Sequence, residues 1–324
     1  MPMAKPHGPS PLPDMDAMMD LVQAFEGLAA KDPLLTGARL SDVIRLVPGK
    51  RAILSGMVGE RPAIFRFYIE HAEAYARRDW AELQRTRCFM SDGKYQVNAP
   101  LLHVPELGLV VAARADGVPL MERIRAADAA QKADFLRPAA EWLRRYTAPS
   151  EDLTEVRLDG WYKRIERGMA RQRHGALRRA ETAVLAELKR IAAPHETGQW
   201  RVAVSHGDFH PNNLLTDGAR LTGIDTGGSA KLPLYKDMAR FLSHMARRGL
   251  IPSGEKRLGV DAQGLDAFAR AFALDEVERN IWLPFMLGVE VLIRIEAKAL
   301  SEKRIRKAAD FYDTLLEGLR DIRP

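Results

Sequence analysis

Side chains that can act as acids, bases or metal ligands gather in one stretch of this chain, SHGDFHPNNLLTDGARLTGID, residues 205–225. Asp208 and Asn213 lie in its first half, and Asp225 ends it. Two short apolar runs separate Asn213 from Asp225, and the Asp-Gly pair between the runs is typical of a hairpin turn. Because a hairpin brings its two ends together, the sequence predicts that these three side chains lie close in space.

The chemistry that these three side chains suit is phosphoryl transfer. Carboxylate and amide oxygens on one patch are ligands for Mg²⁺, which takes one or two protein carboxylates beside phosphate oxygens. An aspartate that does not bind the ion can orient a hydroxyl group for attack on a phosphoryl group. In the alternative interpretation the polar residues only decorate a surface hairpin, which requires the loop, the hairpin and both carboxylates to occur in this order by chance.

The order His206-Gly207-Asp208 followed by Asn213 resembles the HGDxxxxN pattern of the aminoglycoside phosphotransferase and choline kinase superfamily. Asp225, at the end of an apolar run, resembles the metal-binding aspartate of that family. The resemblance implies a protein-kinase-like fold and an ATP-dependent reaction. It also implies that Asp208 is the catalytic base, that His206 braces the loop, and that Asn213 and Asp225 hold Mg²⁺ on the phosphates of ATP.

Two further residues near this stretch have two interpretations each. By the resemblance, Asp237 anchors the backbone of the catalytic loop, whereas an aspartate in the first turn of a helix is also favoured by the helix dipole. His210 lies beside Asp208 in the sequence, which suits a proton shuttle. A purely structural role suits His210 as well.

The upstream half contains a candidate nucleotide-binding pair. Residues 63–68 alternate like a β-strand, with one cation, Arg66, among apolar neighbours. In the superfamily a cation on this strand contacts the nucleotide phosphates and pairs with a glutamate on the next helix. The resemblance therefore implies that Arg66 binds the nucleotide and that Glu82 is its partner, with Glu70 and Glu73 as rivals. In the other interpretation Arg66 extends from an edge strand into solvent.

The apolar run over residues 107–113, followed by Arg114-Ala115-Asp116-Gly117, resembles the hinge that joins the two lobes of a kinase. The resemblance implies that backbone groups from about residue 112 to Ala115, including Ala113, bind the adenine of ATP. Side chains in a hinge carry little information, because the contacts are made by the backbone.

The sequence also departs from the family pattern. The turn before the Arg66 strand reads Pro48-Gly49-Lys50-Arg51 rather than GxGxxG, and Asp225 is followed by Thr226-Gly227-Gly228, without a second acidic metal ligand. The second of these departures leaves the number of bound metal ions open. The missing glycine pattern, together with Arg66 where the superfamily usually has lysine, motivates a second hypothesis, a catalytically weak or inactive nucleotide-binding protein with a scaffolding or regulatory role. Against it, the base and both metal ligands are all present.

The elements that must position these residues follow from apolar spacing. The patterns predict helices over residues 14–30, 72–89, 120–145, 161–191 and from 232 to the C-terminus, and strands over 51–57, 62–68, 96–103, 107–113 and 201–204. We therefore expect an α+β, bilobal protein-kinase-like fold. Its parts are a disordered tail (1–13), a nucleotide-binding lobe (14–113), and a helical lobe with the catalytic loop and acceptor site (114–324).

Composition limits the other classes of protein. The formal charge of +6 and pI of about 9.4 are compatible with nucleic-acid binding, but the basic residues alternate with acidic ones along helices, so no nucleic-acid partner is expected. One cysteine excludes an internal disulfide and a cysteine-based zinc site. The apolar segment 282–295 is interrupted by Pro284, Glu290 and Arg294, which favours a buried helix over a membrane span. A cytoplasmic location is expected.

Together these observations predict a small-molecule kinase: a phosphotransferase with ATP and Mg²⁺ as cofactors and the hydroxyl group of an aminoglycoside-, choline- or sugar-like molecule as acceptor. Acidic residues lining the helical lobe would favour a cationic acceptor, and Glu290 and Glu296 are the candidates. The sequence indicates no oligomeric state.

Overall fold

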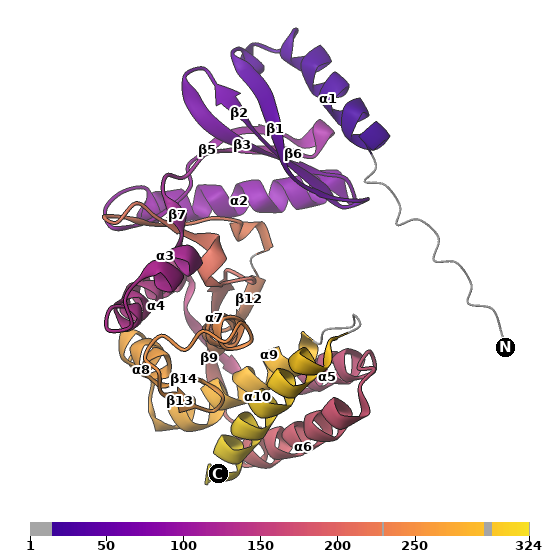
Figure 1. Ribbon diagram of the computed structural model, residues 1–324. Helices are drawn as coiled ribbons and strands as arrows, with labels where there is room; N and C mark the ends of the chain where they lie inside the picture. The colour runs from indigo at the N-terminus through magenta and orange to yellow at the C-terminus, as the bar shows by residue number, and fades with distance from the viewer. Residues whose placement is uncertain (1–14, 229, 295–299, 324) are drawn as a thin grey trace, which may run out of the picture. The chain divides into compact units, whose positions relative to one another are not determined.

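The computed structural model describes residues 15–228, 230–294 and 300–323 (Figure 1). The tail predicted over residues 1–13 lies outside these ranges. Contacts divide the chain into two compact units: unit 1 is Met1–Ser91 with Val97–Ala115, and unit 2 is Asp92–Gln96 with Asp116–Pro324. Within the described ranges, every helix is too short or too polar to span a membrane.

Unit 1 is built on an antiparallel sheet with the strand order β1-β2-β3-β6-β5. Helix α1 (Met15–Ala29) packs on one face of this sheet through a core that contains Phe25, Phe65 and Phe67. Helix α2 (Ala72–Met90) packs on the other face against Val110 and Ala112. The strands are β1 (Ala38–Val47), β2 (Arg51–Val58), β3 (Arg61–Tyr68), β5 (Pro100–Val104) and β6 (Leu109–Ala113).

The central strand β6 is buried on both faces, so it is a continuous apolar run, LVVAA. The strands predicted over residues 51–57 and 62–68 form the hairpin of β2 and β3, with Val58 opposite Arg61 and Gly59 in the left-handed conformation at a φ of 58°. Strand β1 was not predicted. Most of its side chains are exposed, and its register with β2 shifts twice, so it lacks the two-residue alternation that marks a strand in sequence.

Unit 2 contains two small sheets with the strand orders β4-β11-β10-β7 and β12-β9-β8, and a separate two-stranded pair, β13-β14. The first contains the predicted catalytic hairpin, in which β10 pairs with β11. The second contains β9, which leads into the catalytic loop. The strands are β4 (Tyr95–Val97), β7 (Val118–Pro119), β8 (Asp152–Glu155), β9 (Gln199–Ser205), β10 (Leu214–Thr216), β11 (Leu221–Gly223), β12 (Ala230–Pro233), β13 (Lys256–Arg257) and β14 (Val260–Asp261).

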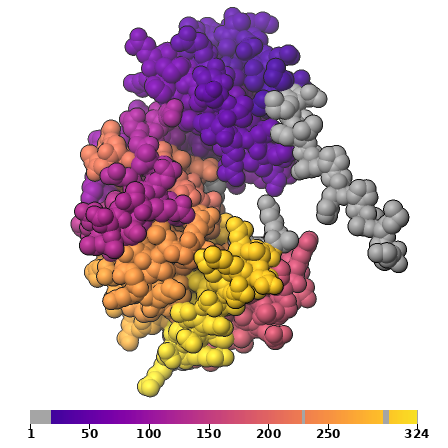
Figure 2. Space-filling view, viewed as in Figure 1, coloured from indigo at the N-terminus to yellow at the C-terminus, as the bar shows by residue number. Residues whose placement is uncertain are grey.

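The helices of unit 2 surround α9 (Leu283–Ile293), which packs against α5, α6 and α7 and is buried from Leu283 to Leu292. This confirms the predicted buried helix. Helix α10 packs against α6, and Figure 2 shows the two side by side on one face, yellow beside rose. The other helices are α3 (Leu120–Ala126), α4 (Leu136–Thr147), α5 (Asp159–Met169), α6 (Gly175–Ala192), α7 (Tyr235–Ala246), α8 (Ala262–Ala271) and α10 (Glu302–Arg320).

Two long helices predicted from apolar spacing are each broken in the structure. The helix expected over 120–145 stops at Ala127, whose backbone is extended, and resumes as α4. The helix expected over 161–191 is divided into α5 and α6. Gln172 fixes this second break, because its Oε1 accepts the His174 N–H at 3.1 Å and its Nε2 donates to Glu181 at 2.7 Å. Side-chain hydrogen bonds of this kind compete with helix continuation and leave the apolar spacing intact.

Candidate active site

The loop between β9 and β10, residues 206–213, carries the predicted catalytic residues. Asp237, in the first turn of α7 and 1% exposed, accepts two of its backbone N–H groups, that of His206 at 2.6 Å and that of Gly207 at 3.1 Å. Gly207 has a φ of 83°, a left-handed conformation that favours glycine. The predicted anchoring contact of Asp237 is therefore confirmed, and it fixes the loop directly before Asp208.

The carboxylate of Asp208 is held by three side chains and stays 45% exposed. Arg240 Nε, from α7, donates to Oδ1 at 2.9 Å. Arg294 Nη2, just after α9, lies 3.3 Å from the same oxygen, and His210 Nε2 lies 3.4 Å from Oδ2. The carboxylate therefore has a defined orientation and still presents nearly half of its surface to a ligand.

The same contacts set the charge of Asp208. Burial by itself raises the pKa of this carboxyl group, but the hydrogen bond with His210 and the positive charges of Arg240 and Arg294 outweigh burial. They hold the pKa of Asp208 well below its ordinary value. The group is therefore ionised at neutral pH and acts as a hydrogen-bond acceptor.

His206 lies beneath the loop and is fully buried. Its Nε2 is 3.0 Å from the carbonyl oxygen of Ile224, and since a carbonyl only accepts, Nε2 carries the proton. The ring lies beside the aromatic rings of Trp142 and Phe209, with centroids 6.0 and 5.8 Å away. His206 thus ties the catalytic loop to the residue that precedes Asp225.

The hairpin brings Asn213 and the backbone of Asp225 to the same end. Leu214 pairs with Gly223, and the Ile224 N–H donates to the Asn213 carbonyl at 3.0 Å. The Asn213 side chain donates through Nδ2 to the Asp208 carbonyl, also at 3.0 Å. The predicted clustering of the three residues around the hairpin end agrees with these backbone contacts.

The oxygen atoms at this end suit a hard cation. Because Asn213 Nδ2 is engaged with the Asp208 carbonyl, Oδ1 is the side-chain atom left to face a ligand. Asp225 has a φ of 60°, a conformation that is uncommon for a residue other than glycine and that clusters at functional sites. In the described ranges, no three His, Cys, Asp or Glu side chains form a metal-binding cluster. An amide oxygen and one carboxylate fit Mg²⁺, which completes its shell with phosphate oxygens and water.

His210 stacks on His244 of α7, with ring centroids 4.1 Å apart and an interplanar angle of 23°. Asn212 Nδ2 lies 3.4 Å from His244 Nε2, which accepts. Burial, followed by the charges of His210, Arg248 and Arg240, lowers the pKa of His244 to about 2. His244 is therefore a neutral support for the His210 ring, and these contacts favour the structural interpretation of His210.

We expect His244 to make the protein less stable in mild acid. Because the pKa of His244 is lowered in the folded state, only the unfolded state takes up this proton below about pH 6.5. The free energy of unfolding therefore decreases by about 1.4 kcal/mol for each unit by which the pH is lowered. The loss amounts to about 2 kcal/mol at about pH 5. Urea unfolding measured near pH 7.5 and near pH 5 should show this loss of stability. The variant His244→Gln, whose new side chain does not titrate, should lack the part of the pH dependence that His244 causes. An identical pH dependence in the variant would contradict the assignment.

In unit 1, Arg66 of β3 is 4% exposed, so it does not extend into solvent. Its Nη2 lies 3.1 Å from Oδ2 of Asp79 on α2, and the Tyr68 hydroxyl donates to the same oxygen at 2.9 Å. Glu82, one turn further along α2, pairs with Arg85 at 2.6 Å. Asp79 was not among the residues predicted from the sequence. The signal was present, because Asp79 lies on the buried face of an otherwise exposed helix, together with Ala76 and Leu83.

The hinge candidates lie at the end of β6. The Ala113 N–H donates to the Ala99 carbonyl at 2.7 Å, and the Arg114 N–H donates to the Pro62 carbonyl at 2.9 Å. Ala115 follows outside any strand. The N–H groups of Ala113 and Arg114 are therefore already engaged, which leaves carbonyl groups of this segment and the backbone of Ala115 for the adenine contact that the resemblance predicts.

Glu290, expected to favour a cationic acceptor, does not have the required environment. It is 1% exposed, and its two oxygens lie 3.3 Å from Lys236 Nζ and 2.8 Å from Arg294 Nε. Its charge is therefore used inside the protein, which corrects the expectation. Glu296, the other candidate, lies outside the described residues.

Three cations next to the loop were not identified from the sequence. Lys236 donates to the Gly207 carbonyl at 3.2 Å, while Arg240 and Arg294 contact Asp208. Arg240 had a usable signal, because it lies three residues after Asp237 and so on the same side of α7. Arg294 had none, since only the packing of α9 brings it to Asp208.

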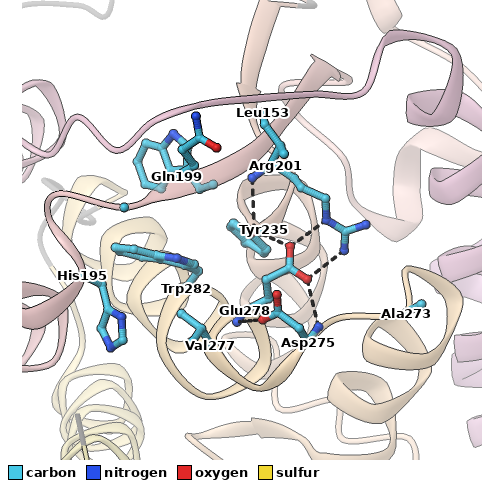
Figure 3. Close-up of a pocket in the computed structure, with 12 residues that line it drawn as sticks. Leu153, His195, Gln199, Arg201, Tyr235, Ala273, Asp275, Val277, Glu278 and Trp282 are labelled. Carbon is cyan, nitrogen blue, oxygen red and sulfur yellow. Dashed lines mark hydrogen bonds and ion pairs between the residues drawn. The ribbon is translucent and has the colours of Figure 1, made fainter.

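A cavity of about 500 Å³ is lined by residues of β9, α7 and the segment after α8, and none of the predicted site residues lines it. Its polar groups are directed at one another (Figure 3): Glu278 accepts from Arg201 at 2.6 Å and from Tyr235 at 2.7 Å. Burial raises the pKa of Tyr235, and the hydrogen bond with Glu278 raises it further. This network joins β9 to the segment before α9 and has the features of a structural contact.

Comparison with known proteins identifies the family to which the chain belongs. A model of a phosphotransferase enzyme family, APH, matches residues 60–224, which is 165 of the 324 residues. This segment contains Arg66, Glu82, the catalytic loop and Ile224. A search of curated proteins found no match.

Solved structures resemble the chain over nearly its full length. The aminoglycoside phosphotransferase APH(4)-Ia is 17% identical with a TM-score of 0.60, and the match covers 96% of this chain and 99% of that one. A choline/ethanolamine kinase family protein from Mesorhizobium loti is 15% identical (TM-score 0.58, 93% and 99% covered). A glucosamine kinase bound to glucosamine, ADP and phosphate is 16% identical (TM-score 0.54, 97% and 84% covered). At these identities the likeness shows the fold, and it confirms the predicted α+β, protein-kinase-like class.

Proposed function

Because the chain belongs to the phosphotransferase enzyme family, we propose that it transfers the γ-phosphate of ATP to a hydroxyl group of a small molecule. One observation carries this proposal. The Asp208 carboxylate is oriented by Arg240 and exposed on a loop that Asp237 anchors, beside the hairpin end where Asn213 and Asp225 meet. A hydroxyl acceptor and a metal-bound phosphate need such an arrangement.

In the proposed reaction, Asp208 accepts a hydrogen bond from the acceptor hydroxyl and aims its oxygen at the γ-phosphorus. The new oxygen–phosphorus bond forms as the bond to the bridging oxygen breaks, ADP leaves, and the hydroxyl proton passes to Asp208. Since the pKa of Asp208 is held low, the carboxylate is a weak base, so the proton moves only when the new bond has made the oxygen acidic. Orientation is then the larger part of its contribution.

Asn213 and Asp225 are the proposed metal ligands, and Mg²⁺ held there would offset the negative charge of the phosphates. His206 keeps this end of the hairpin joined to the loop through the Ile224 carbonyl. In unit 1, we assign Arg66 to the nucleotide phosphates, with Asp79 orienting its guanidinium. Glu82 remains the second acidic candidate there, and the backbone at Ala113 and Ala115 is the proposed adenine contact. Dependence on ATP supports the cytoplasmic location.

A screen of alcohols with Mg-ATP, followed by the formation of ADP, tests the proposal. Aminoglycoside-, choline- and sugar-like alcohols are the starting panel, since similar folds include an aminoglycoside phosphotransferase and a glucosamine kinase. We expect acceptor-dependent ADP formation that EDTA abolishes. Binding of Mg-ATP without turnover on any alcohol would instead support the inactive, nucleotide-binding alternative.

A further inference from the structure

A second cavity of unit 2, of about 470 Å³, is lined by Arg164, Arg167, Gly168, Arg171 and Ile293. We call it the arginine hollow. It lies where the C-terminal half of α5 meets the end of α9, and Figure 1 shows these two helices next to each other. Its size is within the range of small-molecule sites in proteins. Three of its five lining residues are cationic.

The hollow has a fixed geometry because α5 and α9 approach each other closely at Gly168. A Cβ atom at Gly168 would lie 2.3 Å from the Leu292 carbonyl oxygen, so only glycine permits this contact. Arg171 Nη2 also donates to the Ile293 carbonyl at 3.0 Å, joining the end of α5 to the end of α9. The arginines are thus presented from a rigid helix pair.

The three arginines are exposed, and within the described part of the chain none of them forms an ion pair. Arg164 lies 5.0 Å above the Trp161 ring, and Arg167 Nε donates to the Lys163 carbonyl at 3.1 Å. Among the described residues, these neutral partners leave the positive charges unbalanced. Like charges three and four residues apart repel one another, and a bound anion removes that repulsion.

The arginine hollow is connected to the candidate active site by one residue. Ile293, which lines it, is followed by Arg294, whose guanidinium lies 3.3 Å from Asp208. Two of the side chains that contact the Asp208 carboxylate, Arg240 and Arg294, are cationic. A cationic acceptor would meet these two guanidinium groups beside the base and three more in the hollow.

We propose that the arginine hollow binds a phosphate or carboxylate group of the acceptor, so that the alcohol phosphorylated by this chain is itself an anion. This inference rests on the proposed function, because it concerns the acceptor of the proposed reaction. Arginine suits this role because its planar group donates two parallel hydrogen bonds to a carboxylate or phosphate. The hydroxyl group of the same molecule would then reach Asp208 past Arg294.

The first test measures binding without turnover. Wild-type protein saturated with Mg-ADP is titrated with glycerol 3-phosphate, and with glycerol as the matched neutral alcohol. We expect saturable binding of glycerol 3-phosphate alone, weakened at least about tenfold in Arg164→Gln/Arg167→Gln and at higher ionic strength. Arg173→Gln, an exposed arginine that does not line the hollow, is the matched control and should bind like wild type.

The second test measures transfer from Mg-ATP to anionic, neutral and cationic alcohols. We expect an anionic alcohol to have the highest kcat/KM, and the double variant to lower it at least about tenfold, mainly through KM. Inorganic phosphate should compete with that acceptor, because the two share the hollow. Activation by phosphate would assign the hollow to a free anion, and no effect would mean that phosphate and the acceptor do not share it. Either result would overturn the acceptor assignment.

The inference is overturned if a cationic alcohol is preferred, or if the double variant binds glycerol 3-phosphate as tightly as wild type. Failure of the proposed function has a different signature, because the wild-type protein would then phosphorylate none of the anionic, neutral or cationic alcohols, whether or not it binds Mg-ATP. The titration with glycerol 3-phosphate tests whether the arginine hollow binds an anion, whether or not the protein has phosphotransferase activity. Because both substituted arginines are exposed, the variant is expected to unfold at the wild-type temperature.

Discussion

Asp208→Asn is expected to lower kcat by about a thousandfold while the affinity for Mg-ATP stays close to that of wild type. Asparagine keeps the size of the side chain and one oxygen for Arg240, but its amide does not take the proton of the acceptor hydroxyl. Its lone pairs also orient that hydroxyl less strongly than a carboxylate does. The measurement is steady-state turnover with the best alcohol from the acceptor screen, together with calorimetric titration of Mg-ATP.

The control for this substitution is Asp217→Asn, which removes an exposed aspartate at the turn of the same hairpin. It should leave turnover within about twofold of wild type. Thermal unfolding of Asp208→Asn separates chemistry from folding, because Arg240 and Arg294 lose a charged partner in that variant. Wild-type turnover in Asp208→Asn would exclude this residue as the base.

Asp225→Asn is expected to weaken the binding of Mg-ATP by about a hundredfold, since the site loses one of its two protein ligands and its only charge. This substitution is expected to weaken the binding of Mg-ATP rather than to impair the transfer of the hydroxyl proton. In the proposed site, Asn213 alone then faces the ion, and an amide oxygen is a weaker ligand for a hard cation than a carboxylate. Calorimetric titration with ATP in the presence of Mg²⁺ measures the change.

The matched measurement for Asp225 uses ATP in the presence of EDTA. Without the metal, wild type and Asp225→Asn should bind ATP with the same low affinity, because the substitution then removes no contact to the phosphates. A loss of affinity in EDTA equal to that in Mg²⁺ would mean that the substitution damages the fold. Equal affinities of the two proteins in Mg²⁺ would exclude Asp225 as a metal ligand.

The parts of the site that were predictable from sequence are those formed by local chain geometry. Asn213 and Asp225 lie at the two ends of a hairpin, and the Asp-Gly turn indicates that hairpin directly. Asp237 lies in the first turn of α7, in a pattern whose register is clear from apolar spacing. The fold class followed from the change between strand-like and helical patterns. In each case, the residues that produce the sequence signal lie in the same element as the residues that make the contact, or in a neighbouring element.

The cations around Asp208 are a different case. Arg294 lies four residues after Glu290, a spacing that indicates this ion pair, but no residue near it in the sequence indicates that its side chain also meets Asp208. The contact depends on how α9 packs against α7, a property of the whole unit. For the same reason Glu290 was taken for an acceptor ligand, whereas packing pairs it with Lys236. Charges buried by packing have no local signature in a sequence.

Phosphoryl transfer to an alcohol is tested directly by following the labelled phosphate of [γ-³²P]ATP in a mixture of anionic, neutral and cationic alcohols with Mg²⁺ and the wild-type protein. We expect the label to appear in a phosphate monoester of one alcohol, in proportion to the ADP formed. Label that stays in ATP, or that is released only as inorganic phosphate, would contradict this expectation.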